Sequence, residues 1–209
     1  MTPEDLAARY PRLFHLTAPE ALHGIMRFGL RSTSSLLRDC SVTAEARLRI
    51  ETSRRPTEVP LRHPLMGSVT ISDNKPLHEA KLARVLDDGL TPADWLRMLN
   101  ARVFFWARED GLRSLASAAA NRARPRLVLV VDTRRLAQAY ADWIDLCPIN
   151  SGATRGVTRR GLTTFTPMRA MAYEAWRQQR GRRDIVKEVA LRCDIPDVAD
   201  FVVETRRLG

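Results

Sequence analysis

The run Leu127–Val131 (LVLVV) constrains the fold more than any other feature of the chain. Five consecutive apolar residues are too many for a strand with one face in water, so we expect a strand buried inside a core. Shorter segments with strand character lie on either side of it along the chain. They are Arg12–Leu16, Arg102–Trp106, Lys187–Cys193 and Phe201–Val203.

Signals for helix starts are concentrated in the first half of the chain. A hydroxyl residue followed closely by proline and an acidic residue favours a helix N-terminus, and this pattern occurs at Thr2–Asp5, Thr17–Glu20 and Thr91–Asp94. The sequence shows no repeat, no linker and no change of composition between its halves. We therefore predict a single α+β domain over residues 1–209, with a mixed sheet and a helix-rich N-terminal half.

The charge of the chain is unbalanced. Lys and Arg number 34 against 24 Asp and Glu, which gives a formal net charge of +10, and only three of these cations are lysines. Guanidinium groups bind phosphate oxygens in pairs, so the surplus favours a polyanion such as a nucleic acid. A coding habit that replaces lysine by arginine would explain the ratio but not the surplus. The arginines are densest at residues 47–62, 155–160 and 180–183.

Several classes of protein are excluded by what the sequence lacks. No apolar run approaches the roughly 18 residues that a membrane-spanning helix needs, and the N-terminal MTPEDLAARY has no signal-peptide core. Three scattered cysteines indicate a reducing compartment without disulfides, so we expect a cytoplasmic protein with no membrane partner. The sequence contains no Cys-x-x-Cys pair, P-loop or Gly-x-Gly-x-x-Gly element, and its histidines lack ligand spacing, so no metal site is expected.

A few residues are unusual for their surroundings. His15 lies inside an apolar strand, and Glu188 begins the last long strand. Asn100 and Arg102 flank the end of a helix, and Trp106 closes an aromatic strand. Each has a structural interpretation, as a satisfied core histidine, a solvated strand carboxylate, a helix-end contact or a core aromatic. Their joint order along the chain favours a common site.

Three short motifs occur in a distinctive order. The first is Phe14–Thr17 (FHLT) with a helix that ends at Phe28–Leu30 (FGL), and the second is the aromatic stretch Val103–Arg108 (VFFWAR). The third is Lys187–Leu191 (KEVAL), which is followed by Ile195-Pro196. In this order they resemble the ADP-ribosyltransferase superfamily, and most closely the DarT-type enzymes, which modify DNA bases with NAD.

The whole chain also resembles an uncharacterised bacterial domain family with the same layout. The pieces that recur there are Phe14–Thr17, Leu99–Trp106, Pro148–Gly152 and Thr164-Phe165. This resemblance implies an ADP-ribosyltransferase-like split sheet with helices packed around it, and NAD as co-substrate.

The resemblance implies that Glu188 is the catalytic residue. Cleavage of the nicotinamide–ribose bond passes through an oxocarbenium-like state, which a carboxylate stabilises, and the same carboxylate can deprotonate an incoming base nitrogen. His15 would contact a ribose, and Arg102 with arginines of the 54–62 loop would hold the pyrophosphate. Thr17 either contacts the ligand or caps the next helix. The full set implied for NAD is His15, Thr17, Asn100, Arg102, Phe105 and Trp106.

The same resemblance implies a nucleic-acid acceptor and a partner that is an antitoxin or an ADP-ribosyl hydrolase. The arginines expected to guide the acceptor are Arg155, Arg159, Arg160, Arg180, Arg182 and Arg183. The key arginine of DarT-type enzymes aligns with a region that offers several candidates, and the choice among them stays open. These candidates are Arg47, Arg49, Arg54, Arg55 and Arg62.

Two other functions compete with this hypothesis. One is an RNA 2′-phosphotransferase-like enzyme of the same superfamily, which also consumes NAD and would release 2′-phosphate from RNA. The other is a basic nucleic-acid-binding module without catalysis, which predicts steep salt dependence and indifference to the loss of Glu188.

Overall fold

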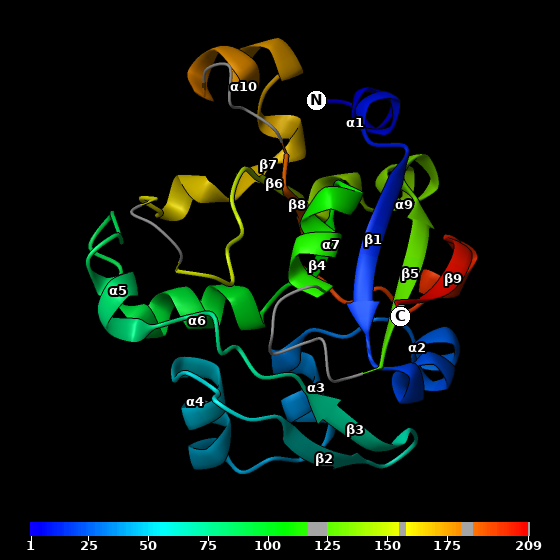
Figure 1. Ribbon diagram of the computed structural model, residues 1–209, viewed down its shortest axis with the longest axis vertical. Coiled ribbons are helices and arrows are strands. Elements are labelled where there is room, and N and C mark those ends of the chain that lie inside the picture. The colour runs from blue at the N-terminus through cyan, green and yellow to red at the C-terminus, as the bar shows by residue number, and fades with distance from the viewer. Residues whose placement is uncertain (117–124, 155–157, 181–185, 209) are drawn as a thin grey trace.

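A seven-stranded sheet with the order β7-β6-β8-β4-β1-β5-β9 forms the centre of the protein. It is seen in a computed structural model that describes residues 1–116, 125–154, 158–180 and 186–208 (Figure 1). The strands are β1 (Arg12–Thr17), β4 (Val103–Trp106), β5 (Arg126–Asp132), β6 (Ile144–Cys147), β7 (Thr166–Pro167), β8 (Glu188–Leu191) and β9 (Val202–Leu208). A separate hairpin pairs β2 (Val59–His63) with β3 (Gly67–Ile71). The predicted α+β class is confirmed.

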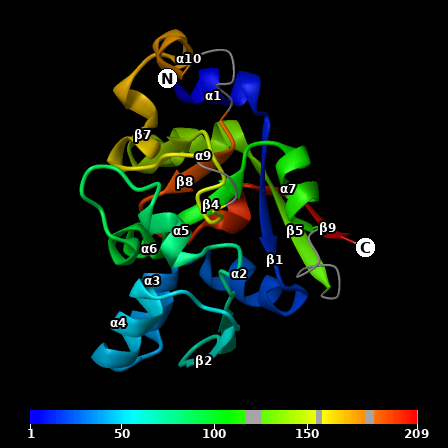
Figure 2. The same ribbon diagram turned by 60° about the vertical axis from the view of Figure 1, so that its left-hand side comes forward.

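Helices surround the sheet, and six of them end by residue 100, as predicted for a helix-rich first half. They are α1 (Pro3–Arg9), α2 (Leu22–Phe28), α3 (Thr33–Asp39), α4 (Ala44–Thr52), α5 (Glu79–Ala83) and α6 (Pro92–Asn100). Later in the chain follow α7 (Glu109–Ala116), α9 (Thr133–Tyr140) and α10 (Tyr173–Arg180). The helices α3 and α4 and the hairpin lie at one end of the molecule, and α1 and α10 lie at the other (Figure 1 and Figure 2).

Local capping signals explain where two of these helices begin. The hydroxyl groups of Thr2 and Thr91 each accept a hydrogen bond from the backbone amide three residues later, and the acidic side chain at that position bonds back to the cap. The alternative role of Thr17 as a helix cap is wrong. Thr17 ends β1, and the following 3₁₀ turn starts after Ala18 without a side-chain cap.

Near the centre of the sheet, two adjacent strands are paired over a short length. Strands β1 and β5 pair over six residues, whereas β1 and β4 share one pair among the described residues, Phe14 with Trp106. The pairings between the named strands of this sheet are antiparallel, and a parallel bridge joins Leu86 to Arg160 outside them. The two halves of the sheet therefore meet over a short junction, as expected for a split sheet.

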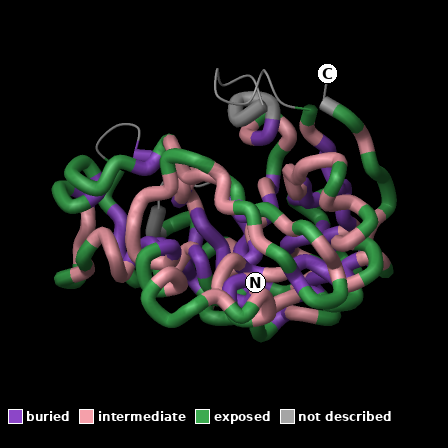
Figure 3. Tube along the Cα trace, turned by 90° about the horizontal axis from the view of Figure 1, so that it is seen from below, coloured by how far each residue is buried: buried purple, intermediate pink, exposed green. Residues whose placement is uncertain are grey.

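Both faces of the sheet are covered, because neighbouring strand residues point to opposite sides. On one face Leu13, Phe105 and Val189 pack in a core that also includes Leu6 of α1 and Leu136 of α9. On the other, a second core joins strand residues to the helices α5 and α6 and to Phe165. Figure 3 shows buried residues in the middle of the molecule and exposed ones around it. The predicted burial of Leu127–Val131 is confirmed.

Three segment predictions are corrected by the structure. Residues 53–57 and 62–64 are rich in arginine and proline and are expected to be loops, but strand β2 extends into the second stretch and its hairpin packs on Leu37 and Ile50. The local sequence does not indicate this strand, because it contains alternating polar residues and Pro60. Both are tolerated in a hairpin that has one face in water. The sequence of Gly161–Phe165 (GLTTF) favours a short strand, but the segment contains a 3₁₀ turn at Leu162–Thr164. Of the segment Lys187–Cys193, only Glu188–Leu191 is a strand, which begins at Glu188 as predicted and ends two residues before Cys193.

Candidate functional site

Glu188 is the first residue of β8 and is buried, with 5% of its surface exposed. In the sheet register it lies opposite Trp106 of β4 on one side and Cys147 of β6 on the other. Both carboxylate oxygens accept a hydrogen bond from the backbone amide of Ser151, at 3.2 Å each. Burial raises the pKa of Glu188 to about 7, against the opposing effects of Ser151, Cys147 and Arg160. A carboxyl group of this kind can accept or donate a proton near neutral pH.

Arg160 lies in the wall of the Glu188 site rather than on the surface. Its side chain donates hydrogen bonds to the carbonyl oxygens of Ser151 (3.3 Å) and Ala153 (2.9 Å), and 2% of the residue is exposed. Its predicted contact with nucleic acid is therefore wrong, because a buried guanidinium cannot reach a phosphate backbone.

The other arginines predicted for the acceptor have different surroundings. Arg159 is exposed and forms an ion pair with Asp87. Arg180 ends α10, and its side chain is not described. The remaining three, Arg155, Arg182 and Arg183, lie outside the described residues.

His15 occupies the junction between β1 and β4. Its Nδ1 lies 2.9 Å from the carbonyl oxygen of Phe104, and its ring contacts that of Phe105 edge-on at 5.7 Å. Because a carbonyl only accepts, Nδ1 carries the proton in this bond, which leaves Nε2 as an acceptor in the neutral ring. Burial lowers the pKa of His15, so the neutral ring dominates at pH 7.

His15 and Glu188 come from nearby strands but point to different faces of the sheet. Phe14 pairs with Trp106, and Trp106 pairs with Glu188, so these three residues share a face. Two strand spacings separate Phe14 from Glu188, which is about 10 Å between their backbones. His15, one position from Phe14, projects toward Phe105 and the opposite core. The predicted single cleft around both residues is therefore not what the sheet register produces.

Two residues predicted to bind NAD are structural instead. Arg102 donates hydrogen bonds to Asp145 (3.2 and 3.3 Å) and to the carbonyl of Met98 (2.7 Å), so its guanidinium is already occupied. The amide of Asn100 donates to the carbonyl of Glu51 (2.9 Å) and accepts from Arg55 (3.1 Å), which ties α6 to α4. Neither side chain is available for a pyrophosphate.

The two aromatic residues predicted for NAD differ in exposure. Phe105 is fully buried in the core, so it cannot stack on a ligand. Trp106 is half-buried, and its ring packs on Gly111, where an added Cβ would lie 2.6 Å from the indole. Trp106 therefore remains as the aromatic neighbour of Glu188. Thr17 is half-buried and forms no hydrogen bond through its side chain with any described residue.

Most of the arginines considered for the key position of DarT-type enzymes form hydrogen bonds or ion pairs within the protein. Arg54 donates to the carbonyl of Lys75, and Arg55 donates to the carbonyls of Ile50 and Ser72. Arg47 pairs with Glu51 within α4. The two others, Arg49 and Arg62, form no ion pair with a described carboxylate. The predicted grip of the 54–62 loop on a pyrophosphate is therefore not supported at Arg54 and Arg55.

A cleft of about 280 Å³, which sequence reasoning missed, lies at the same end of the strands as Glu188. Phe14 and Ala107 are part of its wall, and the backbone amide of Ala107 donates to the carbonyl of Lys187, the neighbour of Glu188. Three arginines contribute to the lining, together with Tyr10, Pro11, Glu109 and Asp110; they are Arg9, Arg12 and Arg108. Arg9 and Arg12 are three residues apart, but Arg108 is distant in the sequence, so no local pattern marks the three as a group.

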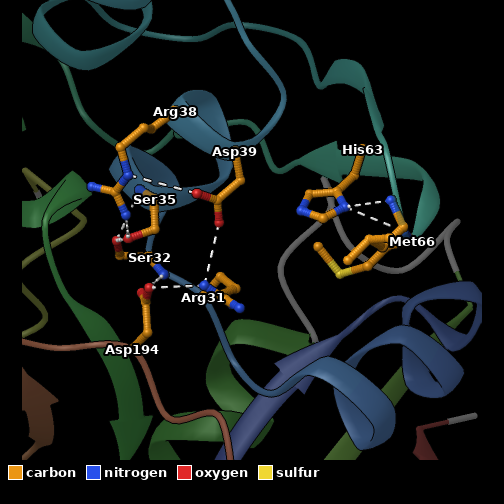
Figure 4. Close-up of polar contacts among 9 residues, drawn as sticks. Arg31, Ser32, Ser35, Arg38, Asp39, His63, Met66 and Asp194 are labelled. Carbon is orange, nitrogen blue, oxygen red and sulfur yellow. Dashed lines mark hydrogen bonds and ion pairs between the residues drawn. The ribbon is translucent and has the colours of Figure 1, made fainter.

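Two motifs of the DarT-type resemblance, Phe28–Leu30 and Ile195-Pro196, lie side by side, where they form a structural contact and not a binding site. Leu30 and Ile195 exchange backbone hydrogen bonds at 3.0 and 2.9 Å, and Gly29 lies against Pro196. Figure 4 shows the polar contacts beside this bridge. There Asp194 accepts from the backbone amide of Ser32 at 2.8 Å and pairs with Arg31 at 3.5 Å. These contacts join the end of α2 to the segment after β8.

The profile of a family described as a family of unknown function (DUF7002) matches residues 11–202. The chain belongs to this family. The match includes Glu188, Ser151 and Arg160, whereas Arg9 and Tyr10 of the cleft precede the matched region. No curated protein matches this DUF7002 chain.

The described part of this DUF7002 protein lacks two kinds of feature. None of its helices there is long and apolar enough to cross a membrane. No group of three or more His, Cys, Asp or Glu side chains in those ranges has the geometry of a metal site.

Proposed function

We propose that this DUF7002 protein is an NAD-dependent ADP-ribosyltransferase that modifies a nucleic-acid base, with Glu188 as the catalytic carboxylate. The observation that carries the proposal is the environment of Glu188. It is a buried carboxylate at the start of a central strand, hydrogen-bonded by the amide and the hydroxyl of Ser151, with a pKa of about 7. A strongly shifted carboxyl group with a defined partner is typical of a catalytic site.

The chemistry needs one carboxylate in two roles. In its ionised form Glu188 would stabilise the positive charge that develops on the ribose as the bond to nicotinamide breaks and its electron pair leaves with nicotinamide. A base nitrogen then forms the new bond to the ribose carbon, and its proton passes to Glu188 and from there to solvent. A pKa near 7 suits both roles, because the carboxylate is partly ionised yet basic enough to take the proton.

The cleft beside the junction supports a nucleic acid as the acceptor. Arg9, Arg12 and Arg108 give it three cationic groups, although each also pairs with a carboxylate, Arg9 with Glu174, Arg12 with Asp132 and Arg108 with Asp110. Guanidinium groups exchange a carboxylate for a phosphate readily, because both present two oxygens in a plane. Trp106, which pairs with Phe14 of the cleft, offers an aromatic ring between the cleft and Glu188.

The test follows the label from NAD to an acceptor. The protein is incubated with NAD labelled in its adenylate phosphate and with single-stranded DNA, duplex DNA, RNA or a protein pool. We expect label on one of the nucleic acids, and we expect Glu188→Gln to lower the rate by about 10²- to 10⁴-fold. The matched control is Glu204→Gln, because Glu204 is an exposed glutamate on the edge strand β9.

The outcomes separate the competing functions. No label in any pool, with equal behaviour of Glu188→Gln and wild type, overturns the proposal. Label on protein alone overturns the acceptor class. Release of 2′-phosphate from RNA without stable label replaces it with the phosphotransferase alternative.

A further inference from the structure

Arg160 has an unusual position for an arginine in a strongly basic chain. Its backbone is fixed on both sides, since its amide donates to Val85 (2.9 Å) and its carbonyl accepts from Asp87 (2.8 Å). Its side chain is buried and forms no ion pair with any carboxylate in the described ranges. A buried cation without a paired anion is costly, so its retention calls for a role.

The contacts of Arg160 converge on the residue that holds Glu188. The carbonyl of Ser151 accepts from Arg160 at 3.3 Å and from the indole of Trp95 at 3.2 Å, and Trp95 is itself fully buried. On its other side, Ser151 directs its amide at both oxygens of Glu188. Two donors therefore fix the orientation of Ser151, and its amide in turn orients the carboxylate.

We infer that Arg160 is a positioning residue, which holds the Ser151 amide against Glu188 and supplies the positive charge that favours the ionised carboxylate. This inference rests on the proposed function only where it predicts an effect on catalysis. The groups that act on Glu188 are the hydroxyl and the amide of Ser151, the Cys147 thiol on β6 and Arg160 itself. Of these, Arg160 alone carries a fixed charge.

The first test measures the ionisation of Glu188 directly and needs no enzymatic activity. The protein is labelled with carbon-13 at the glutamate side-chain carboxyl, and the Glu188 signal is identified by its loss in Glu188→Gln. We expect Arg160→Gln to move the midpoint of this signal to higher pH, by about one pH unit. The matched control is Arg159→Gln, which removes the adjacent exposed arginine and should leave the midpoint in place.

Several results would overturn the inference. One is a folded Arg160→Gln variant in which the Glu188 signal has the same pH midpoint as in wild type. Another is a shift of this midpoint in Arg159→Gln that equals the shift in Arg160→Gln. If Arg160→Gln does not fold, Arg160→Lys is tested instead, because lysine keeps the positive charge but lacks the several N–H donors of the planar guanidinium. We expect a smaller shift there, together with weaker protection of the Ser151 amide from hydrogen exchange. Wild-type values of both measurements contradict a positioning role.

A second test uses the transferase assay and separates this inference from the proposed function. In an active enzyme, Arg160→Gln should lower kcat at least tenfold with little change in the KM for NAD, and should move the acidic limb of the pH profile upward. Arg160→Lys should restore part of the rate. If the wild type transfers no label but the Glu188 signal still shifts, the proposed function fails and the positioning role of Arg160 stands.

Discussion

The backbone amide of Ser151 donates to both carboxylate oxygens of Glu188, 37 residues further along the chain, at 3.2 Å each. The Ser151 hydroxyl and the Cys147 thiol also bond to this carboxylate, but together these neutral donors compensate only in part for an ionised carboxylate removed from water. Glu188 consequently keeps its proton to a much higher pH than an exposed glutamate does. The same relationship that makes Glu188 a candidate catalyst also makes it a source of instability.

Replacing Glu188 by Gln should stabilise the protein at high pH. Its pKa is about 7 when folded against 4.5 ordinarily, so the folded state binds the additional proton and stability falls as pH rises from about 4.5 to 7. We expect Glu188→Gln to exceed wild type by about 3 kcal/mol at pH 8 and to match it near pH 4. Urea unfolding at several pH values measures this. An equal loss of stability in the variant at every pH would contradict it.

Gly29 should tolerate no side chain, because two independent constraints act on it. Its φ is 85°, and an added Cβ would lie 2.3 Å from the carbonyl oxygen of Ile195. We expect Gly29→Ala to destabilise the protein by at least about 2 kcal/mol, measured by urea unfolding. The control is Gly89→Ala, which has a φ of 69° but open space around its Cβ, and should cost only about 1 kcal/mol. Equal losses would show that the contact with Ile195 contributes nothing.

Asp145 should be essential for stability, since it is the buried counter-charge of two arginines. Its oxygens accept from Arg102 at 3.2 Å and from Arg192 at 3.1 Å. We expect Asp145→Asn to cost about 3 kcal/mol, because it leaves the largely buried Arg102 without an anion. Thermal unfolding provides the measurement. Asp142→Asn, which removes an exposed carboxylate paired with Arg169, should change stability by less than about 1 kcal/mol.

The cleft arginines should determine how nucleic-acid binding responds to salt. If Arg12 and Arg108 each neutralise one phosphate, each change to Gln should reduce the slope of log K against log salt by about 0.7 for a single strand. Fluorescence anisotropy of a labelled oligonucleotide at several salt concentrations gives the slope. Arg169→Gln removes an exposed arginine that does not line the cleft and should leave the slope unchanged. An unchanged slope in both cleft variants would place the nucleic acid elsewhere.

The elements that depend on nearby residues could be predicted from the sequence. The apolar run Leu127–Val131 is a buried strand, and the capping patterns at Thr2 and Thr91 start helices, because the interactions involved span four residues or fewer. Glu188 was identified as the first polar group of a late strand, and it does begin β8. Its burial and its bond to Ser151 needed the structure.

The partners of two arginines could not be predicted from the sequence. Arg102 and Arg160 look like any other cation in a chain with a formal net charge of +10. Yet Arg102 donates a hydrogen bond to Asp145, and the buried Arg160 donates one to the carbonyl of Ser151. Nothing within a few residues of either arginine encodes these partners, because they belong to segments brought together by folding.

Four features could be predicted from the residues alone: the α+β class, the central buried strand, the starts of two helices and the presence of a strand glutamate among apolar residues. Which polar groups share a site depends on how the chain folds. The register that sets Glu188 opposite Trp106 and Cys147 also turns His15 to the other face of the sheet. The physical reason is one of range: patterning and capping act within a few residues, whereas register, burial and the pKa of a carboxylate depend on contacts between distant segments.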